Sequence, residues 1–152
     1  MQRNSGKKSP RFMIIDDSMY ARELIKQNLL QIYDDLSDDN IKEFPGAVEA
    51  LDDLQNADPD SPMPDLIICD LIMPEMDGLT FIKKVRANPG LKELPIFVVS
   101  AQSAHSKVIG TLKAGGNGYL SKPYSNEIFQ EKILQILKKQ KEQKKNNKKE
   151  DS

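Results

Sequence analysis

The chain has 152 residues, of which 30% are charged and 38% hydrophobic, and its formal net charge is −1. This length fits one domain with a sizeable core and leaves little room for two. No stretch approaches the roughly 20 apolar residues of a membrane span, no apolar segment follows the basic residues near Met1, and one cysteine cannot close an internal disulfide. We therefore expect a cytoplasmic protein with no membrane contact, in which Cys69 is a small buried hydrophobe.

The charges are unevenly distributed along the chain. Residues 138–152 hold seven lysines and three acidic residues, about +4, so the preceding 137 residues hold 15 basic and 20 acidic residues, about −5. Residues 1–10 are predicted to be a disordered lead, 11–137 a domain, and 138–152 a frayed or disordered tail without an apolar face. Such a tail can contact nucleic acid through counterion release. A solubilising role is the simpler interpretation, so nucleic acid is not an expected partner.

Strands and helices are predicted to alternate five times within residues 11–137. Apolar runs predict strands over 12–15, 66–69 and 94–99, with weaker candidates at 41–44 and 119–120. Apolar residues at helical spacing predict helices over about 18–33, 47–54, 79–87, 103–113 and 125–137. This alternation predicts an α/β fold, a parallel five-stranded sheet with helices on both faces and right-handed crossovers.

Polar side chains follow four of these strands. Asp16 and Asp17 follow the first strand, Asp70 the third, Ser100 the fourth and Lys122 the fifth. Taken singly, an aspartate there caps a turn, a serine starts a helix and a loop lysine is solvent-exposed. Parallel strands, however, end at one edge of a sheet, where ligands bind. We therefore expect the five side chains to converge.

Three neighbouring carboxylates repel one another and need a cation. Donor sets made of oxygen alone favour a hard ion, and Mg²⁺ combines one or two carboxylates with waters and phosphate oxygens. A carboxylate beside Mg²⁺ can attack phosphorus, and phosphoryl transfer needs mainly positioning and charge neutralisation. In this interpretation Asp70 is the nucleophile and Asp16 and Asp17 hold the metal. Lys122 and Ser100 contact phosphoryl oxygens.

In these motifs the chain resembles the receiver domain of bacterial two-component response regulators, and closely the single-domain chemotaxis type. The resemblance covers about residues 11–137. Its motifs are Ile15-Asp16-Asp17-Ser18 with Arg22, the run from Asp70 to Gly78, Val99-Ser100-Ala101, and the run from Ala114 through Lys122-Pro123 to Tyr124.

The resemblance implies a flavodoxin-like (βα)5 fold with strand order 2-1-3-4-5 and a cis Lys122-Pro123 peptide bond. It implies Asp70 as phospho-acceptor, and Asp17, Asp70 and the main-chain carbonyl of Ile72 as Mg²⁺ ligands. Asp16 acts partly through water. Ser100 and Lys122 are the switch pair, and Tyr119 is the aromatic rotamer switch.

The implied role is a stand-alone signalling protein rather than an enzyme, although it catalyses its own phosphorylation and dephosphorylation. Its partners are a sensor histidine kinase or a histidine phosphotransfer protein, and a downstream protein target. Phosphorylation shifts a pre-existing equilibrium of the face formed by the fourth helix, fifth strand and fifth helix.

Two other functions share parts of this pattern. A phosphorylation-independent scaffold is the alternative, and the complete set of acidic residues, Ser100 and Lys122 argues against it. A metal-dependent phosphate hydrolase would have a second catalytic aspartate at position 72, where this chain has Ile72. Ile72 is aliphatic where many relatives are polar, and it is expected, with Gln102, to flank the attacking water. His105 is expected to be a solvated surface residue.

Overall fold

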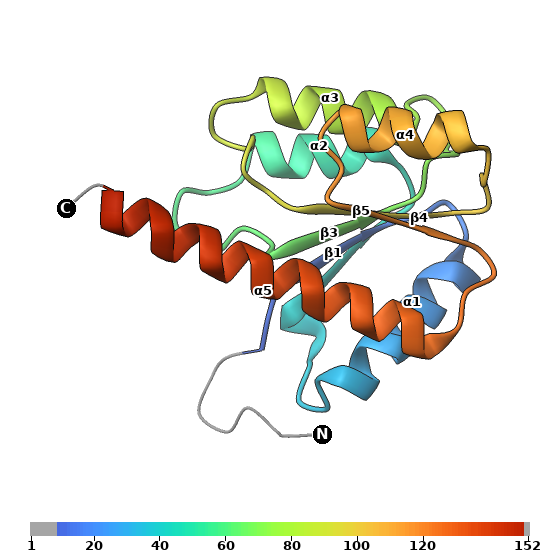
Figure 1. Ribbon diagram of the computed structural model, residues 1–152, viewed down its shortest axis with the longest axis horizontal. Helices are drawn as coiled ribbons and strands as arrows, with labels where there is room; N and C mark the ends of the chain where they lie inside the picture. Colours follow the sequence, from blue (N-terminus) through green and yellow to red (C-terminus); the bar gives the residue numbers. More distant parts are fainter. Residues whose placement is uncertain (1–8, 151–152) are drawn as a thin grey trace.

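Residues 9–150 are described by a computed structural model in which strands and helices alternate (Figure 1). The strands are β1 (Phe12–Ile15), β2 (Ile41–Phe44), β3 (Leu66–Cys69), β4 (Ile96–Ser100) and β5 (Gly118–Ser121). The α-helices are α1 (Met19–Ile32), α2 (Ala47–Gln55), α3 (Gly78–Ala87), α4 (His105–Lys113) and α5 (Asn126–Glu150). A short 3₁₀ helix, η1 (Asp38–Asn40), precedes β2.

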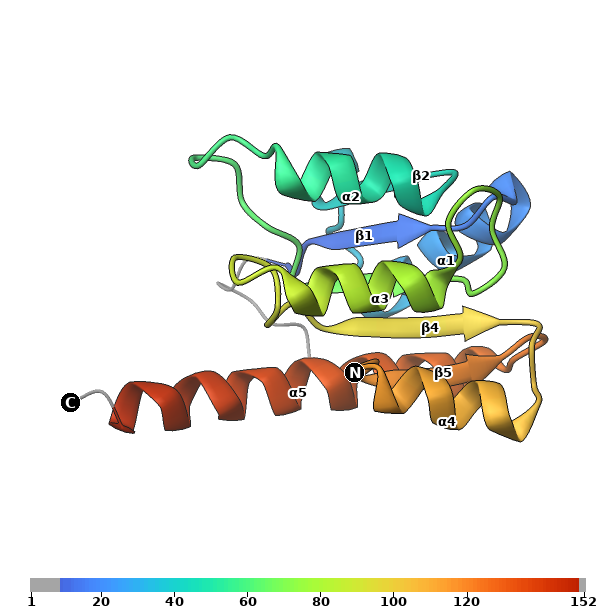
Figure 2. The same cartoon turned by 90° about the horizontal axis from the view of Figure 1, so that it is seen from above.

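The five strands form one parallel sheet in the order β2-β1-β3-β4-β5. Helices α1 and α5 cover one face, and α2, α3 and α4 cover the other (Figures 1 and 2). The predicted flavodoxin-like (βα)5 fold and strand order are confirmed. In this order β1 and β3, which carry the three aspartates, are neighbours.

Each central strand contributes to two cores because its side chains alternate between the faces of the sheet. On β1, Phe12 and Ile14 join the core under α1 and α5, whereas Met13 and Ile15 join the core under α2 and α3. All four side chains are buried. This two-sided burial explains why the strand sequences are continuous apolar runs rather than alternating patterns.

Arg86 near the end of α3 ties together two loops at the edge opposite the strand C-termini. Its guanidinium donates to the carbonyls of Lys92 at 2.9 Å, Leu94 at 2.7 Å and Gly115 at 2.8 Å, and to the side chain of Asn117 at 2.9 Å. These bonds hold the connections into β4 and β5. No pattern in the sequence pointed to this role.

Several element boundaries differ from the sequence prediction. β4 begins at Ile96 rather than 94, because Leu94 closes a turn by donating its backbone N–H to Leu91 at 3.0 Å. β5 extends over four residues instead of two. The predicted domain boundary at 137 marks the end of the apolar face of α5, but helical backbone continues to Glu150, consistent with the high helix propensity of Lys, Gln and Glu.

Most of the predicted N-terminal lead, residues 1–8, lies outside the described residues, as do Asp151 and Ser152. In the part of the chain that the structure describes, no helix combines the length and hydrophobicity needed to cross a bilayer.

Candidate functional site

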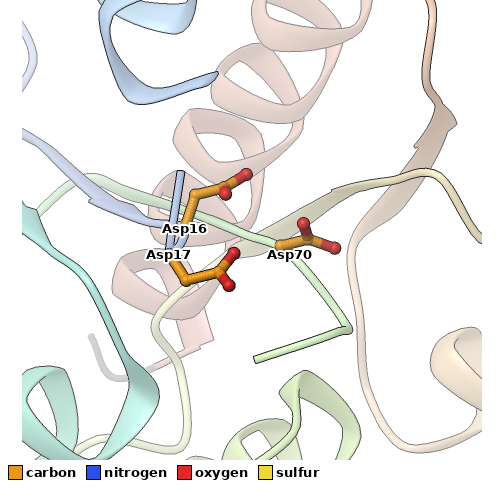
Figure 3. A group of neighbouring side chains, drawn as sticks. All are labelled: Asp16, Asp17 and Asp70. Atoms are coloured by element: carbon orange, nitrogen blue, oxygen red, sulfur yellow. The ribbon is translucent and has the colours of Figure 1, made fainter. Parts of the chain in front are cut away.

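The acidic site lies just beyond the C-terminal ends of β1 and β3. Asp16 and Asp70 are nearly buried, with 2% and 8% of their surface exposed, whereas Asp17 is exposed. One carboxylate oxygen from each lies within 4.8 Å of the others (Figure 3). The structure thus brings together the three aspartates that the strand pattern predicted.

Lys122, from the end of β5, supplies a cation to this cluster. Its ammonium donates to Asp16 Oδ2 at 2.7 Å and to Asp70 Oδ2 at 3.2 Å. The peptide bond between Lys122 and Pro123 is cis, as predicted. Lys122 is therefore no solvent-exposed loop lysine but a bridge between two carboxylates.

The electrostatics of the site follow from burial and from these contacts. Burial raises the pKa of Asp16, and the opposing hydrogen bonds from Lys122 and the Ser18 amide do not cancel it. Burial of Lys122 disfavours its charge, but the hydrogen bonds and charges of Asp16 and Asp70 outweigh burial and raise the pKa of Lys122. Lys122 is thus held in its charged form.

Backbone groups orient the two buried carboxylates. Asp16 Oδ1 accepts from the Ser18 amide at 2.9 Å, and Asp70 Oδ1 accepts from the Ile72 amide at 3.2 Å. The Ser18 hydroxyl also caps α1, accepting from the Ala21 amide at 3.1 Å. These bonds hold each carboxylate beside the loop that follows its strand.

Arg22 supports the site from α1, a role that the sequence did not reveal. Its Nη1 donates to the main-chain carbonyl of Asp16 at 2.6 Å, and its Nε pairs with Glu43 of β2 at 3.2 Å. The motif spacing marked Arg22 only as part of the resemblance. Because α1 begins at Met19, Arg22 lies about one turn into the helix and next to the end of β1. This spacing is the sequence signal that could have predicted the contact.

Ser100 and Tyr119 lie on the neighbouring strands. Ser100 is fully buried at the end of β4, and its hydroxyl accepts from the Gln102 amide at 3.3 Å. The Tyr119 hydroxyl donates to the carbonyl of Gln102. Burial raises the pKa of Tyr119, against a lowering contact from Ser100. Tyr119 thus joins β5 to the loop between β4 and α4, next to Ser100.

Ile72 gives the site an apolar margin. Its side chain is 53% exposed two residues after Asp70, while its amide hydrogen-bonds to Asp70. Gly78 at the start of α3 lies behind the same loop, where an added Cβ would stand 2.4 Å from the Asp70 carbonyl oxygen. The close approach of α3 to the acceptor residue therefore requires glycine.

Two predicted residues lie outside the acidic site. His105 is exposed at the first turn of α4, as expected of a surface residue. Cys69 is buried, and burial raises the pKa of its thiol well above the usual value, so Cys69 is a core residue and not a nucleophile.

The donor set suits a hard divalent cation. Three carboxylates converge without imidazole, and the buried thiol of Cys69 donates to the Asp70 carbonyl at 3.1 Å instead of facing the cluster as a thiolate. Oxygen ligands of this kind favour Mg²⁺, Ca²⁺ or Mn²⁺ over softer metals. Among the described side chains Lys122 is the one cation in contact with these carboxylates, and it offsets only part of their negative charge. The cluster therefore has the composition of a metal site.

The fold and the acidic site are shared with a known protein family. Residues 12–134 match the model of the response regulator receiver domain, so the chain belongs to the response regulator receiver family. It is 36% identical over 129 residues to the chemotaxis protein CheY1 of Helicobacter pylori, covering 84% of this chain and 96% of that protein. A CheY homolog of Campylobacter jejuni is 36% identical over 128 residues, covering 84% and 92%.

Within the family, this similarity along nearly the whole length of both relatives places the chain with the single-domain, chemotaxis-type receivers. Solved structures agree. The chemotaxis response regulator CheY4 of Vibrio cholerae superposes with a TM-score of 0.71 at 25% identity, covering 85% of this chain and 99% of that one. A CheY-like receiver from Methanospirillum hungatei has a TM-score of 0.74 at 22% identity, covering 90% and 99%, which supports the fold alone.

Proposed function

We propose that this protein is a cytoplasmic phospho-acceptor that receives a phosphoryl group on Asp70 from the phosphohistidine of a sensor histidine kinase or a histidine phosphotransfer protein. The observation that carries the proposal is the contact of Lys122 with both Asp16 and Asp70 inside a three-carboxylate cluster. A buried carboxylate beside a fixed ammonium and a potential metal site has the surroundings that phosphoryl transfer requires.

Each residue has a defined part in the proposed reaction. An Asp70 oxygen forms a bond to phosphorus while the phosphorus–nitrogen bond of the donor breaks and its imidazole leaves with the electron pair. Mg²⁺ bound by Asp16, Asp17, Asp70 and the Ile72 carbonyl would neutralise phosphoryl oxygens. Lys122 is close enough to Asp70 to contact one phosphoryl oxygen.

The proposed output is a change in the face formed by α4, β5 and α5. Ser100 is expected to bond to a new phosphoryl oxygen, which removes its hydroxyl from its present contact with the Gln102 amide. Tyr119 holds the carbonyl of the same residue, so both switch residues act on one loop that leads into α4. A population shift of this loop would present a different surface to a downstream protein.

Intact-mass spectrometry after incubation with Mg²⁺ and acetyl phosphate tests the acceptor. We expect a mass gain of one phosphoryl group in the wild type, none in Asp70→Asn, and none when a chelator removes Mg²⁺. Asp60→Asn, which removes an exposed carboxylate elsewhere, is the matched control and gains the same mass as wild type. No gain in the wild type would overturn the proposal and leave the phosphorylation-independent scaffold as the interpretation.

Hydrogen exchange tests the output face separately. Addition of Mg²⁺ and the phosphoryl mimic beryllium trifluoride is expected to change exchange rates in α4, β5 and the first turns of α5 in the wild type, and to leave Asp70→Asn unchanged. Changes confined to the loops around Asp70 would contradict the proposed switching face while leaving the acceptor role intact.

A further inference from the structure

The last part of α5 projects beyond the rest of the molecule. In both views the helix continues past the sheet and the other helices (Figures 1 and 2). Leu137 is the last residue of α5 that packs against the core, and among the described side chains of 138–146 only Gln140 is less than exposed. Residues 138–150, here named the lysine arm, span about 20 Å at the helical rise of 1.5 Å per residue.

Helical geometry sorts the charges of the lysine arm. At about 100° per residue, Lys141, Lys144 and Lys145 fall within an arc of about 100°, because they occupy positions i, i+3 and i+4. Lys138 occupies a position at one edge of this arc. Lys139 and Glu142 lie outside it. Beyond Leu137 the helix therefore carries a lysine stripe and no apolar stripe.

Within the part of the chain that the structure describes, the lysines of the arm are not neutralised by acidic side chains. Among the side chains that the structure describes, those of Lys138, Lys139, Lys141, Lys144 and Lys145 form no ion pair. Their charge is directed to solvent and is available to a partner.

In place of the solubilising role expected from composition alone, we propose that the lysine arm binds the phosphate backbone of a DNA duplex without reading its sequence. Backbone binding needs cations spaced along a surface and gains free energy from released counterions. Lysine suits it as a compact point charge that requires no bidentate geometry.

The composition of the arm argues against a protein and against a membrane as its partner. Protein interfaces depend on aromatic, arginine and apolar anchors and are depleted of lysine, and residues 138–150 contain no aromatic, arginine or apolar residue. A helix that lies on a membrane needs an apolar face, which the arm lacks. Of these three kinds of partner, a phosphate backbone best fits a helix that has exposed lysines and no apolar anchors.

The acidic body does not cancel this attraction. The chain up to residue 137 carries about −5, which would repel DNA at short range. The Debye length is about 8 Å at physiological ionic strength, whereas the arm extends about 20 Å from the body. The outer half of the arm therefore lies beyond most of the repulsion from the body.

Fluorescence anisotropy of a labelled, mixed-sequence DNA duplex, titrated with the full chain over a series of salt concentrations, tests the proposal. With about five phosphates contacted, we expect log K to fall against log salt with a slope of about −4.5. The triple variant Lys141→Gln, Lys144→Gln, Lys145→Gln should bind at least about tenfold more weakly at low salt, with a slope of about −2. The control is the triple variant Lys83→Gln, Lys84→Gln, Lys92→Gln, which removes the same charge from exposed positions outside the arm and should bind DNA like wild type. This control shows that the weaker DNA binding is caused by the arm.

A variant with a rearranged arm distinguishes the effect of the lysine stripe on DNA binding from the effect of net charge. Exchanging residues 140 with 141 and 143 with 144 (Gln140→Lys, Lys141→Gln, Gln143→Lys, Lys144→Gln) keeps composition and charge but distributes the lysines around the helix. Weaker DNA binding by this variant supports the proposal, and equal binding overturns it. Binding of labelled polyglutamate as tight as that of DNA would also overturn it and assign the arm to an acidic protein.

Discussion

Lys122 is the residue whose removal disturbs the acidic site most directly. Without its ammonium, the buried Asp16 and Asp70 keep their mutual repulsion and lose their cation. We expect Lys122→Met to lower the free energy of unfolding by about 2 kcal/mol at neutral pH in the absence of divalent cations, since breaking a largely buried ion pair leaves charge uncompensated. Urea unfolding followed by circular dichroism measures the difference.

The difference in stability between wild type and Lys122→Met is predicted to depend on pH. The raised pKa of Asp16 means that burial penalises its charged form, so the penalty is present above the folded pKa and disappears as the pH falls toward its ordinary 3.8. The raised pKa of Lys122 means that its stabilisation is present below 10.5 and is lost as the pH rises through the folded pKa. The stability gap between wild type and Lys122→Met should therefore be largest near neutral pH and narrow at both ends. A gap that widens toward pH 4 would contradict this account.

Ile72 is predicted to prolong the phosphorylated state. Its half-exposed apolar side chain adjoins Asp70 and offers an attacking water no hydrogen-bond partner. If Asp70 is the acceptor, Ile72→Asn should speed loss of the phosphoryl group several-fold, measured as release of inorganic phosphate after removal of acetyl phosphate. Leu134→Asn, a comparably exposed apolar residue on α5, should leave the rate unchanged. An unchanged rate in Ile72→Asn would exclude a role for Ile72.

The residues of the site differ in how well sequence predicts them. Asp16, Asp70 and Lys122 were predictable because each directly follows a strand, with Asp17 one residue later, and parallel strands end at one edge. The partners of Arg22 and Arg86 were not, because their carbonyl acceptors are set by the approach of loops distant in sequence. Any arginine at the end of a helix can equally remain in solvent.

Among the elements, α4 is the least secured by its own sequence. It has no side-chain N-cap bond, and Thr111 is its single buried residue. Val108, Ile109, Gly110 and Thr111 follow one another, and all four disfavour helix relative to alanine. A helix held mainly by weak contacts is suited to the proposed change in conformation.

Gly110→Ala is predicted to stabilise α4. A Cβ at this position meets no heavy atom within 4 Å, so alanine gains helix propensity without a clash. We expect the free energy of unfolding to rise by about 0.5–1 kcal/mol, with slower hydrogen exchange in α4. Gly78→Ala is the contrasting variant, because its Cβ would stand 2.4 Å from the Asp70 carbonyl oxygen, and it should destabilise the protein and impair phosphorylation. A loss of stability in Gly110→Ala would show that α4 packs more tightly than the structure indicates.

The edge strands and the charged end of α5 have the weakest sequence signals. β2 is found with the predicted bounds, Ile41–Phe44, whereas β5 has four residues instead of the predicted two. Lys42 and Glu43 of β2 are exposed and Leu120 is the buried residue of β5, so the apolar pattern of both strands is weak. The tertiary pairing of β2 with β1 and of β5 with β4 decides their extent. In α5 the apolar pattern underestimates the length of the element, because the apolar face ends at residue 137 whereas the helix continues to Glu150.

At the scale of the whole molecule, alternation of strands and helices was sufficient to predict the layers but not the strand order. The apolar runs of β1 and β3 show that both are central, but several orders would bury them equally. The order came from the resemblance of the site motifs, and the structure confirms it. The motifs thus supplied information on topology that the hydrophobic pattern lacks.

The extent of the folded unit is a final prediction at this scale. The free energy of unfolding of a chain ending after Leu137 should lie within about 0.5 kcal/mol of that of the full chain, because the described side chains of the lysine arm are almost all exposed. A chain ending after Lys132 should be largely unfolded. It lacks Ile133 and Ile136, which are buried against the sheet, and removing side chains of this kind costs about 2–5 kcal/mol each against a total stability of about 5–15 kcal/mol. Urea unfolding of the two shortened chains measures this. A loss above about 2 kcal/mol in the longer one would show that the arm stabilises the domain and that the boundary at 137 is wrong.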